Sequence, residues 1–67
     1  MGKYDLLREK VERDGGTVQH MTFDAGSAIT VKYPDMAVKM FSAYWGDEKD
    51  AVDLASEWVG GLKDANR

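Results

Sequence analysis

One histidine, a run of acidic side chains and a set of aromatic rings are the residues of this sequence that could do chemistry. His20 could act as a general base, but that role needs a pocket and an orienting partner. The chain has no cysteine, and no motif supplies a nucleophile for a histidine to activate. We therefore expect His20 to be a surface residue of a strand, and we predict that the protein is not an enzyme.

The acidic side chains are concentrated between residues 47 and 57. Asp50, Asp53 and Glu57 recur at the spacing that places side chains on one side of a helix. One interpretation is a solvated helix face whose first acids favour the positive end of the helix dipole. The other is a surface that docks on an Arg/Lys-rich partner. The candidate acidic binding residues are Asp47, Glu48, Asp50, Asp53 and Glu57.

A metal or cofactor site is not expected. The acids lack the Asp-x-Asp-x-Asp-Gly spacing of a calcium loop, and a rigid helix cannot wrap carboxylates around an ion. The absence of cysteine and the single histidine disfavour zinc and haem. The two Gly-Gly pairs match no phosphate-binding loop.

Two amphipathic helices are expected to flank the strands. Tyr4, Leu7 and Val11 form an apolar stripe in a helix over about residues 3–14, which Gly15-Gly16 should end. A second helix over about residues 47–60 should begin with Asp47 as its N-cap and end or fray at Gly60-Gly61, before a short C-terminal tail. Its apolar stripe is Ala51, Leu54 or Ala55, Trp58 and Leu62.

Alternating apolar and polar residues between the helices predict three strands, at about residues 17–23, 28–33 and 37–45. A short connection and a turn at Pro34 join them into an antiparallel meander. We predict one small α+β domain over residues 1–67. It is a two-layer α-β-β-β-α structure with both helices on one face of the sheet, and the other face is open to solvent.

The open sheet face is the second candidate binding surface. With Ile29, Val31, Tyr33, Val38 and Met40 assigned to the helix-covered face, Thr30, Lys32, Lys39 and Phe41 face solvent. If Met21 and Phe23 also point inward, His20 and Thr22 lie beside them on the open face. Phe41, Tyr44 and Trp45 cannot all point inward without a bulge near Ser42. Such a bulge could instead bring Phe41 or Trp45 into the core. The candidate binding residues here are Lys32, Lys39, Phe41, Tyr44 and Trp45.

The order helix, three strands, helix is similar in topology to the double-stranded-RNA-binding domain. That family binds phosphates through a lysine cluster at the start of its last helix, which corresponds here to Asp47-Glu48-Lys49-Asp50-Ala51-Val52-Asp53. Four acids and one lysine would repel phosphate. The resemblance therefore concerns the fold, and the family's RNA-binding residues are not carried over to this sequence.

The charge balance favours a protein partner. Nine Lys+Arg against twelve Asp+Glu give a net charge of -3, the wrong sign for general binding of nucleic acid or anionic membranes. Residues 1–6 lack the apolar core of a signal peptide, which favours the cytoplasm. We predict a small acidic protein-binding domain whose partner has a basic, nucleic-acid-binding surface.

In size and charge the chain looks like the inhibitors that bacteriophages encode against host machinery, including anti-CRISPR proteins. The expected function is a stoichiometric inhibitor or regulator of nucleic-acid-handling host machinery. One alternative is a nucleic-acid-binding module that stacks bases on the open sheet face. The other is a homodimeric structural protein, and the expected state is a monomer or a weak homodimer.

Overall fold

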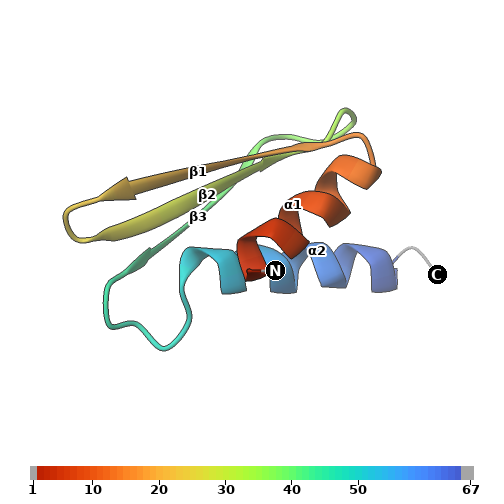
Figure 1. The fold of residues 1–67 in the computed structure, drawn as a ribbon. Coiled ribbons are helices and arrows are strands. Elements are labelled where there is room, and N and C mark those ends of the chain that lie inside the picture. The colour runs from red at the N-terminus through yellow and green to blue at the C-terminus, as the bar shows by residue number, and fades with distance from the viewer. Residues whose placement is uncertain (1, 66–67) are drawn as a thin grey trace.

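The elements follow one another as α1, β1, β2, β3 and α2, and the helices lie together on one side of the sheet (Figure 1). The computed structural model describes residues 2–65. The bounds are α1 Lys3–Arg13, β1 Thr17–Phe23, β2 Gly26–Lys32, β3 Lys39–Tyr44 and α2 Ala51–Ala65. The sheet is antiparallel in the order β1-β2-β3; α1 contacts β1, and α2 contacts β2 and β3. The predicted two-layer α+β fold is confirmed.

The end of α1 is set by Gly15, which has a φ of 86°. In this left-handed conformation the Gly15 N–H donates to the carbonyl of Glu12 at 3.0 Å, and the Gly16 N–H donates to that of Val11 at 2.9 Å. These two bonds satisfy carbonyls that the helix itself leaves without partners. The predicted glycine stop is confirmed.

The strands are joined by two short connections. β1 and β2 pair up to Phe23↔Gly26, so their turn is shorter than the predicted connection and β2 begins earlier. A Cβ atom on Gly26 would lie 2.0 Å from the carbonyl oxygen of Ala43. β3 can therefore lie this close to β2 only because residue 26 is glycine. Between β2 and β3, the Met36 N–H donates to the carbonyl of Tyr33 at 3.3 Å, which confirms the predicted turn around Pro34.

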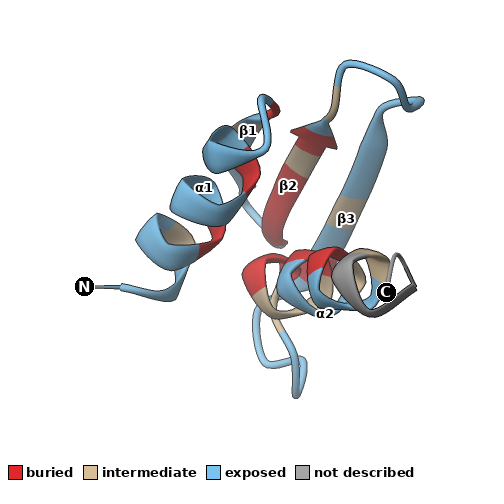
Figure 2. Cartoon of the chain, turned by 90° about the vertical axis from the view of Figure 1, so that its right-hand side faces the viewer, coloured by how far each residue is buried: buried red, intermediate tan, exposed pale blue. Residues whose placement is uncertain are grey.

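The core lies between the central strand and the inner faces of the two helices (Figure 2). Ile29 and Val31 of β2 are fully buried there. Their buried helical neighbours are Leu7, Val11, Ala51, Val52, Ala55 and Val59. Half-buried side chains surround them: Tyr4, Val18, Tyr33, Phe41 and Trp58. The predicted stripe of α1 is thus confirmed.

The start of α2 differs from the prediction. The helix begins at Ala51, and Asp47 closes a turn instead of capping it. The Asp47 N–H donates to the carbonyl of Tyr44 at 3.1 Å, and its carboxylate accepts the Tyr44 N–H at 2.9 Å. The helix then continues through Gly60-Gly61 to Ala65. Of the expected tail, residues 66–67 lie outside the described residues.

The predicted faces of β1 and β3 are wrong. Ile29 pairs with His20 on one side and with Phe41 on the other, and directly paired residues share a face. Since Ile29 points into the core, His20, Thr22 and Phe41 occupy the helix-covered face, whereas Met21, Phe23 and Met40 occupy the open one. β3 pairs continuously from Tyr44 to Lys39, so Phe41 reaches the helix-covered face without the bulge near Ser42 that was considered as one alternative.

Candidate protein-binding face

The open face is the surface of the sheet that faces away from the helices. We define it by the alternate residues that share the face of Thr30: Thr17, Gln19, Met21, Phe23, Gly26, Ala28, Thr30, Lys32, Met40, Ser42 and Tyr44. Neither helix crosses this side of the sheet in Figure 1. All three strands supply members of the set, so the face extends over the whole width of the sheet.

The open face is apolar at its centre and nearly free of charge. Met21 is 65% exposed, Met40 69% and Tyr44 66%, which are high fractions for large apolar side chains. Phe23 is also exposed. Within the defined set Lys32 is the charged member. Exposed apolar side chains on both outer strands of an uncovered sheet face are typical of a surface that another protein covers.

Trp45 directly follows β3, at the end of the sheet where the β1–β2 turn lies. Its indole N–H donates to the carbonyl of Asp24 at 2.9 Å, and its backbone N–H donates to the carbonyl of Ala25 at 2.8 Å. The side chain is held against the turn and yet leaves 59% of the residue exposed. Exposed tryptophan and tyrosine, each with one polar group, are enriched at protein interfaces.

The expected cluster of Phe41 with Lys32, Lys39 and His20 does not form. The Phe41 ring packs against Trp58 of α2 with centroids 5.8 Å apart. Lys39 pairs with Val31 and so takes a position on the helix-covered side, where it is exposed. The His20 ring lies 5.2 Å from that of Tyr4. Only Lys32 of the predicted cluster lies on the open face.

Sequence reasoning missed Met21, Phe23 and Met40 as members of the open face, although a signal was present for β1. A hairpin connection of either two or four residues pairs the even residues of β1 with Ile29 and Val31. With Ile29 and Val31 assigned to the core, Met21 and Phe23 had to face solvent. The hydrophobicity of Met21 and Phe23, taken alone, suggested instead that both side chains face the helices.

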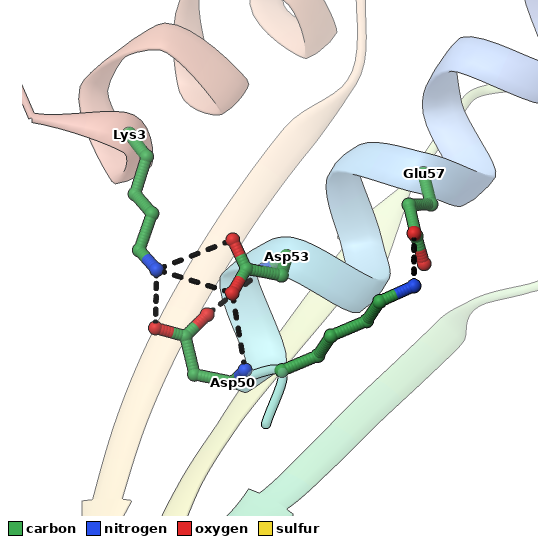
Figure 3. A network of polar contacts seen from close by, with 5 residues as sticks. Lys3, Asp50, Asp53 and Glu57 are labelled. Carbon is green, nitrogen blue, oxygen red and sulfur yellow. Dashed lines mark hydrogen bonds and ion pairs between the residues drawn. The ribbon is translucent and has the colours of Figure 1, made fainter. Parts of the chain in front are cut away.

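The acidic residues at the start of α2 are engaged within the chain (Figure 3). The Asp53 N–H donates to Asp50 Oδ1 at 2.9 Å, and the Asp50 N–H donates to Asp53 Oδ2 at 3.2 Å. This reciprocal pair is a capping box, with Asp50 as N-cap. The Nζ atom of Lys3 lies 2.7 Å from Asp50 Oδ2 and 3.2 Å from Asp53 Oδ2. Hydrogen bonds from Lys3 and from the Asp53 backbone lower the pKa of Asp50, and the same acids raise the pKa of Lys3.

The remaining predicted acids are placed separately. Glu57 forms an ion pair with Lys49, and this hydrogen bond raises the pKa of Lys49. Asp47 is used by the turn described above, and Glu48 is exposed. Lys3 and Lys49 thus form ion pairs with three of the five predicted acids, Asp50, Asp53 and Glu57. The ion pairs of Lys3 with Asp50 and Asp53 link α1 to the start of α2.

Two hollows lie elsewhere on the described part of the molecule. The larger, about 440 Å³, lies between the β2–β3 connection and α2 and is lined by Asp14, Tyr33, Pro34, Asp35, Met36, Val59 and Leu62. Burial, and then the charge of Asp14, raise the pKa of Tyr33. The smaller lies between the helices. His20 lines neither hollow, and the side chains that the structure describes, those of residues 2–62, form no cluster that could hold a metal ion.

Comparisons with protein-family models, with curated proteins and with solved structures found no match to this chain. Among the described residues, no helix has the length and apolar character needed to cross a membrane.

Proposed function

We propose that the protein is a non-enzymatic protein-binding domain that contacts its partner through the open face. The observation that carries the proposal is the high exposure of Met21, Met40 and Tyr44 on a sheet surface whose one charged member is Lys32. Burial of these side chains by a partner would release water from apolar surface, which is the main driving force of protein association.

The size of the face suits a modest interface. Strands about 4.8 Å apart, with about 3.3 Å per residue, give three strands a projected area of roughly 300 Å². An exposed apolar patch of a few hundred Å² is the size at which such patches mark binding sites. Tyr44, which is exposed on this face, supplies an aromatic side chain of the kind that dominates many interfaces.

We propose further that the partner is a protein that handles nucleic acid, and that binding inhibits or regulates it, in the manner of phage-encoded anti-CRISPR inhibitors. The net charge of -3 favours approach to a basic surface. The proposal includes a cytoplasmic location.

Direct binding of nucleic acid is the less favoured alternative. Each phosphate contact contributes only about 0.9 to the logarithmic salt slope, and the open face offers Lys32 alone for such contacts. Lys39 lies on the other side of the sheet.

The test is affinity capture from nuclease-treated host lysate with the wild-type chain and two charge variants. Met40→Glu places a charge on the open face, whereas Leu6→Glu makes the same change on α1, at a residue 47% exposed. The proposal expects a retained protein that Met40→Glu loses and Leu6→Glu keeps. Equal retention by both variants would contradict a role for the open face. Loss of all retained material on nuclease treatment would favour the nucleic-acid alternative.

A further inference from the structure

Strand β3 forms an outer edge of the sheet, and its pairing with β2 fixes which of its backbone groups point outward. The Trp45 N–H donates to the carbonyl of Ala25 at 2.8 Å, one step past the pair Gly26↔Tyr44. Hydrogen-bonded pairs alternate with unbonded pairs in an antiparallel ladder. Counting back from Trp45, the odd-numbered residues of β3 therefore bond to β2. The even-numbered residues direct their N–H and C=O groups away from the sheet: Met40, Ser42 and Tyr44.

The contacts of Tyr44 agree with this alternation. Its N–H donates to Asp47 Oδ2 at 2.9 Å, and its carbonyl accepts the Asp47 N–H at 3.1 Å. Both outward groups of Tyr44 are thus occupied by the turn that follows β3. Within the described residues, no segment bonds to the outward backbone groups of Met40 and Ser42. The edge is therefore closed at Tyr44 and open at Met40 and Ser42.

The open part of this edge lacks the features with which proteins usually protect an edge strand. Those features are charged side chains, proline, a bulge, or a helix or loop that covers the edge. Met40 and Ser42 are uncharged, β3 contains no proline, and its ladder to β2 is continuous. Lys39, the charged residue of β3, lies at the start of the strand. An unprotected edge of this kind is a template for a further strand.

The other edge of the sheet, on β1, is less accessible. The same alternation turns the even-numbered residues of β1 outward: Val18, His20 and Thr22. Val18 packs against the core, and the His20 ring lies 5.2 Å from that of Tyr4 in α1. Figure 2 shows α1 beside β1, on the side away from β2, and the two elements are in contact. This helix hinders a further strand at β1, which leaves β3 as the available edge.

We propose that an extended segment of the partner protein pairs antiparallel with β3 as a fourth strand, bound at Met40 and Ser42. An extended backbone presents N–H and C=O groups in the alternation that these two residues offer, at a repeat of about 6.8 Å. A helix uses the same groups for its own hydrogen bonds. The inference rests on the proposed function and deepens it, because it names the conformation of the partner at the binding site.

The side chains around the edge favour an apolar segment. Directly opposite residues of an antiparallel pair share a face. The residue opposite Met40 would thus lie on the open face, next to a side chain that is 69% exposed. The residue opposite Phe41 would lie on the helix-covered side, next to the ring that packs against Trp58. The added strand would also widen the open face, so that one partner contacts the backbone edge and the apolar surface together.

The first test selects binding segments from a displayed library of random peptides of about nine residues, a length sufficient for a strand. The immobilised full chain is the bait. A selected peptide is then added at saturation to the wild-type chain, and amide hydrogen exchange is followed by NMR. Exchange at Met40 and Ser42 should slow by about tenfold or more, because a hydrogen-bonded amide must open before it exchanges, whereas exchange at Thr22 should not change. Selection of no binding peptide, or a bound peptide that leaves Met40 and Ser42 unprotected, would overturn the proposal.

The second test removes a donor from the edge. Ser42→Pro deletes an outward N–H and keeps the bonds of β3 to β2, and proline is tolerated at such edge positions. Thr22→Pro, the matched control, makes the same change on the outer side of β1. Ser42→Pro should weaken binding of the selected peptide by about tenfold, and Thr22→Pro should bind it as the wild type does. Equal binding by the two variants would overturn the proposal. Circular dichroism establishes that both are folded, and the exchange experiment uses the wild-type chain and does not depend on them.

The capture experiment separates this inference from the proposed function. A captured protein that Met40→Glu loses and Ser42→Pro retains would contradict the fourth strand alone and leave the open face as the binding surface. Equal retention by Met40→Glu and Leu6→Glu would instead contradict the open face itself.

Discussion

Neighbouring residues of one strand have different roles here because they point to opposite faces. Phe41 packs against Trp58, while Met40 beside it is 69% exposed. An alternation of this kind separates residues that hold the sheet to the helices from residues available to a partner. Substitutions at the two positions therefore distinguish folding from binding.

We predict that Phe41→Ala lowers the free energy of unfolding by about 2–3 kcal/mol, somewhat less than the 3–5 kcal/mol typical of a fully buried phenylalanine. Met40→Ala, the matched control, should change it by about 0.5 kcal/mol or less. Urea denaturation followed by circular dichroism measures both. Equal losses in the two variants would contradict the assigned register of β3.

The carboxylate of Asp50 makes stability depend on pH. Its contacts with Lys3 and the Asp53 N–H lower its folded pKa below the ordinary value of 3.8. The unfolded chain therefore binds the proton more readily than the folded chain does. This contribution is complete above the unfolded pKa and is lost as the pH falls through the lower, folded pKa.

The corresponding prediction concerns the loss of unfolding free energy between about pH 7 and about pH 3. Asp50→Asn keeps a side chain that can cap α2 but cannot titrate, so this variant should lose less stability than the wild type on acidification. Glu48→Gln, which removes an exposed acid that makes no ion pair or hydrogen bond within the described chain, serves as the control and should follow the wild type. If Asp50→Asn loses as much as the wild type does, the Lys3 contact contributes nothing to acid sensitivity.

At the scale of elements, α2 shows how packing overrides a local stop signal. Gly60-Gly61 would end an isolated helix, yet α2 continues to Ala65. Val59, directly before the pair, is 1% exposed, and its burial against α1 and the sheet keeps this part of the chain helical. A Cβ atom at Gly60 would meet nothing within 4 Å.

Gly60→Ala should therefore stabilise the protein by about 0.5–1 kcal/mol, because alanine loses less backbone entropy than glycine in a helix. Gly15→Ala should instead destabilise it by about 1–2 kcal/mol, because φ there is 86° and alanine is strained at positive φ. Thermal unfolding of both variants tests the contrast. Destabilisation by Gly60→Ala would show that the helix ends where the glycines begin.

For the whole molecule, net charge and the open face together control solubility. Repulsion between copies disappears near the isoelectric point, about pH 4.9, while the apolar face stays exposed. We predict a maximum of light scattering near this pH. Met40→Glu and Leu6→Glu change the net charge equally. If Met40→Glu reduces the light scattering more than Leu6→Glu does, the open face is the associating surface. Equal reductions would assign the effect to charge alone.

The sequence by itself determined the order of the elements, the glycine stop of α1, the turn at Pro34 and the two-layer fold. These features depend on local periodicity and on backbone preferences of glycine and proline, which act over a few neighbouring residues. The burial of Leu7, Val11, Ile29 and Val31 follows from the same periodicity.

Only the tertiary structure decided which side of β1 and β3 faces the helices, and what the acids of α2 contact. The faces depend on pairing with β2: because Ile29 is buried, its partners His20 and Phe41 share its side, whatever their own hydrophobicity. The contacts of the acidic residues depend on Lys3. This residue lies far away in the sequence, and the packing of α1 on α2 brings it to Asp50. Contacts between distant segments of the chain thus give Asp50 and Asp53 a partner on α1, while the binding role predicted for the acidic residues stays a prediction.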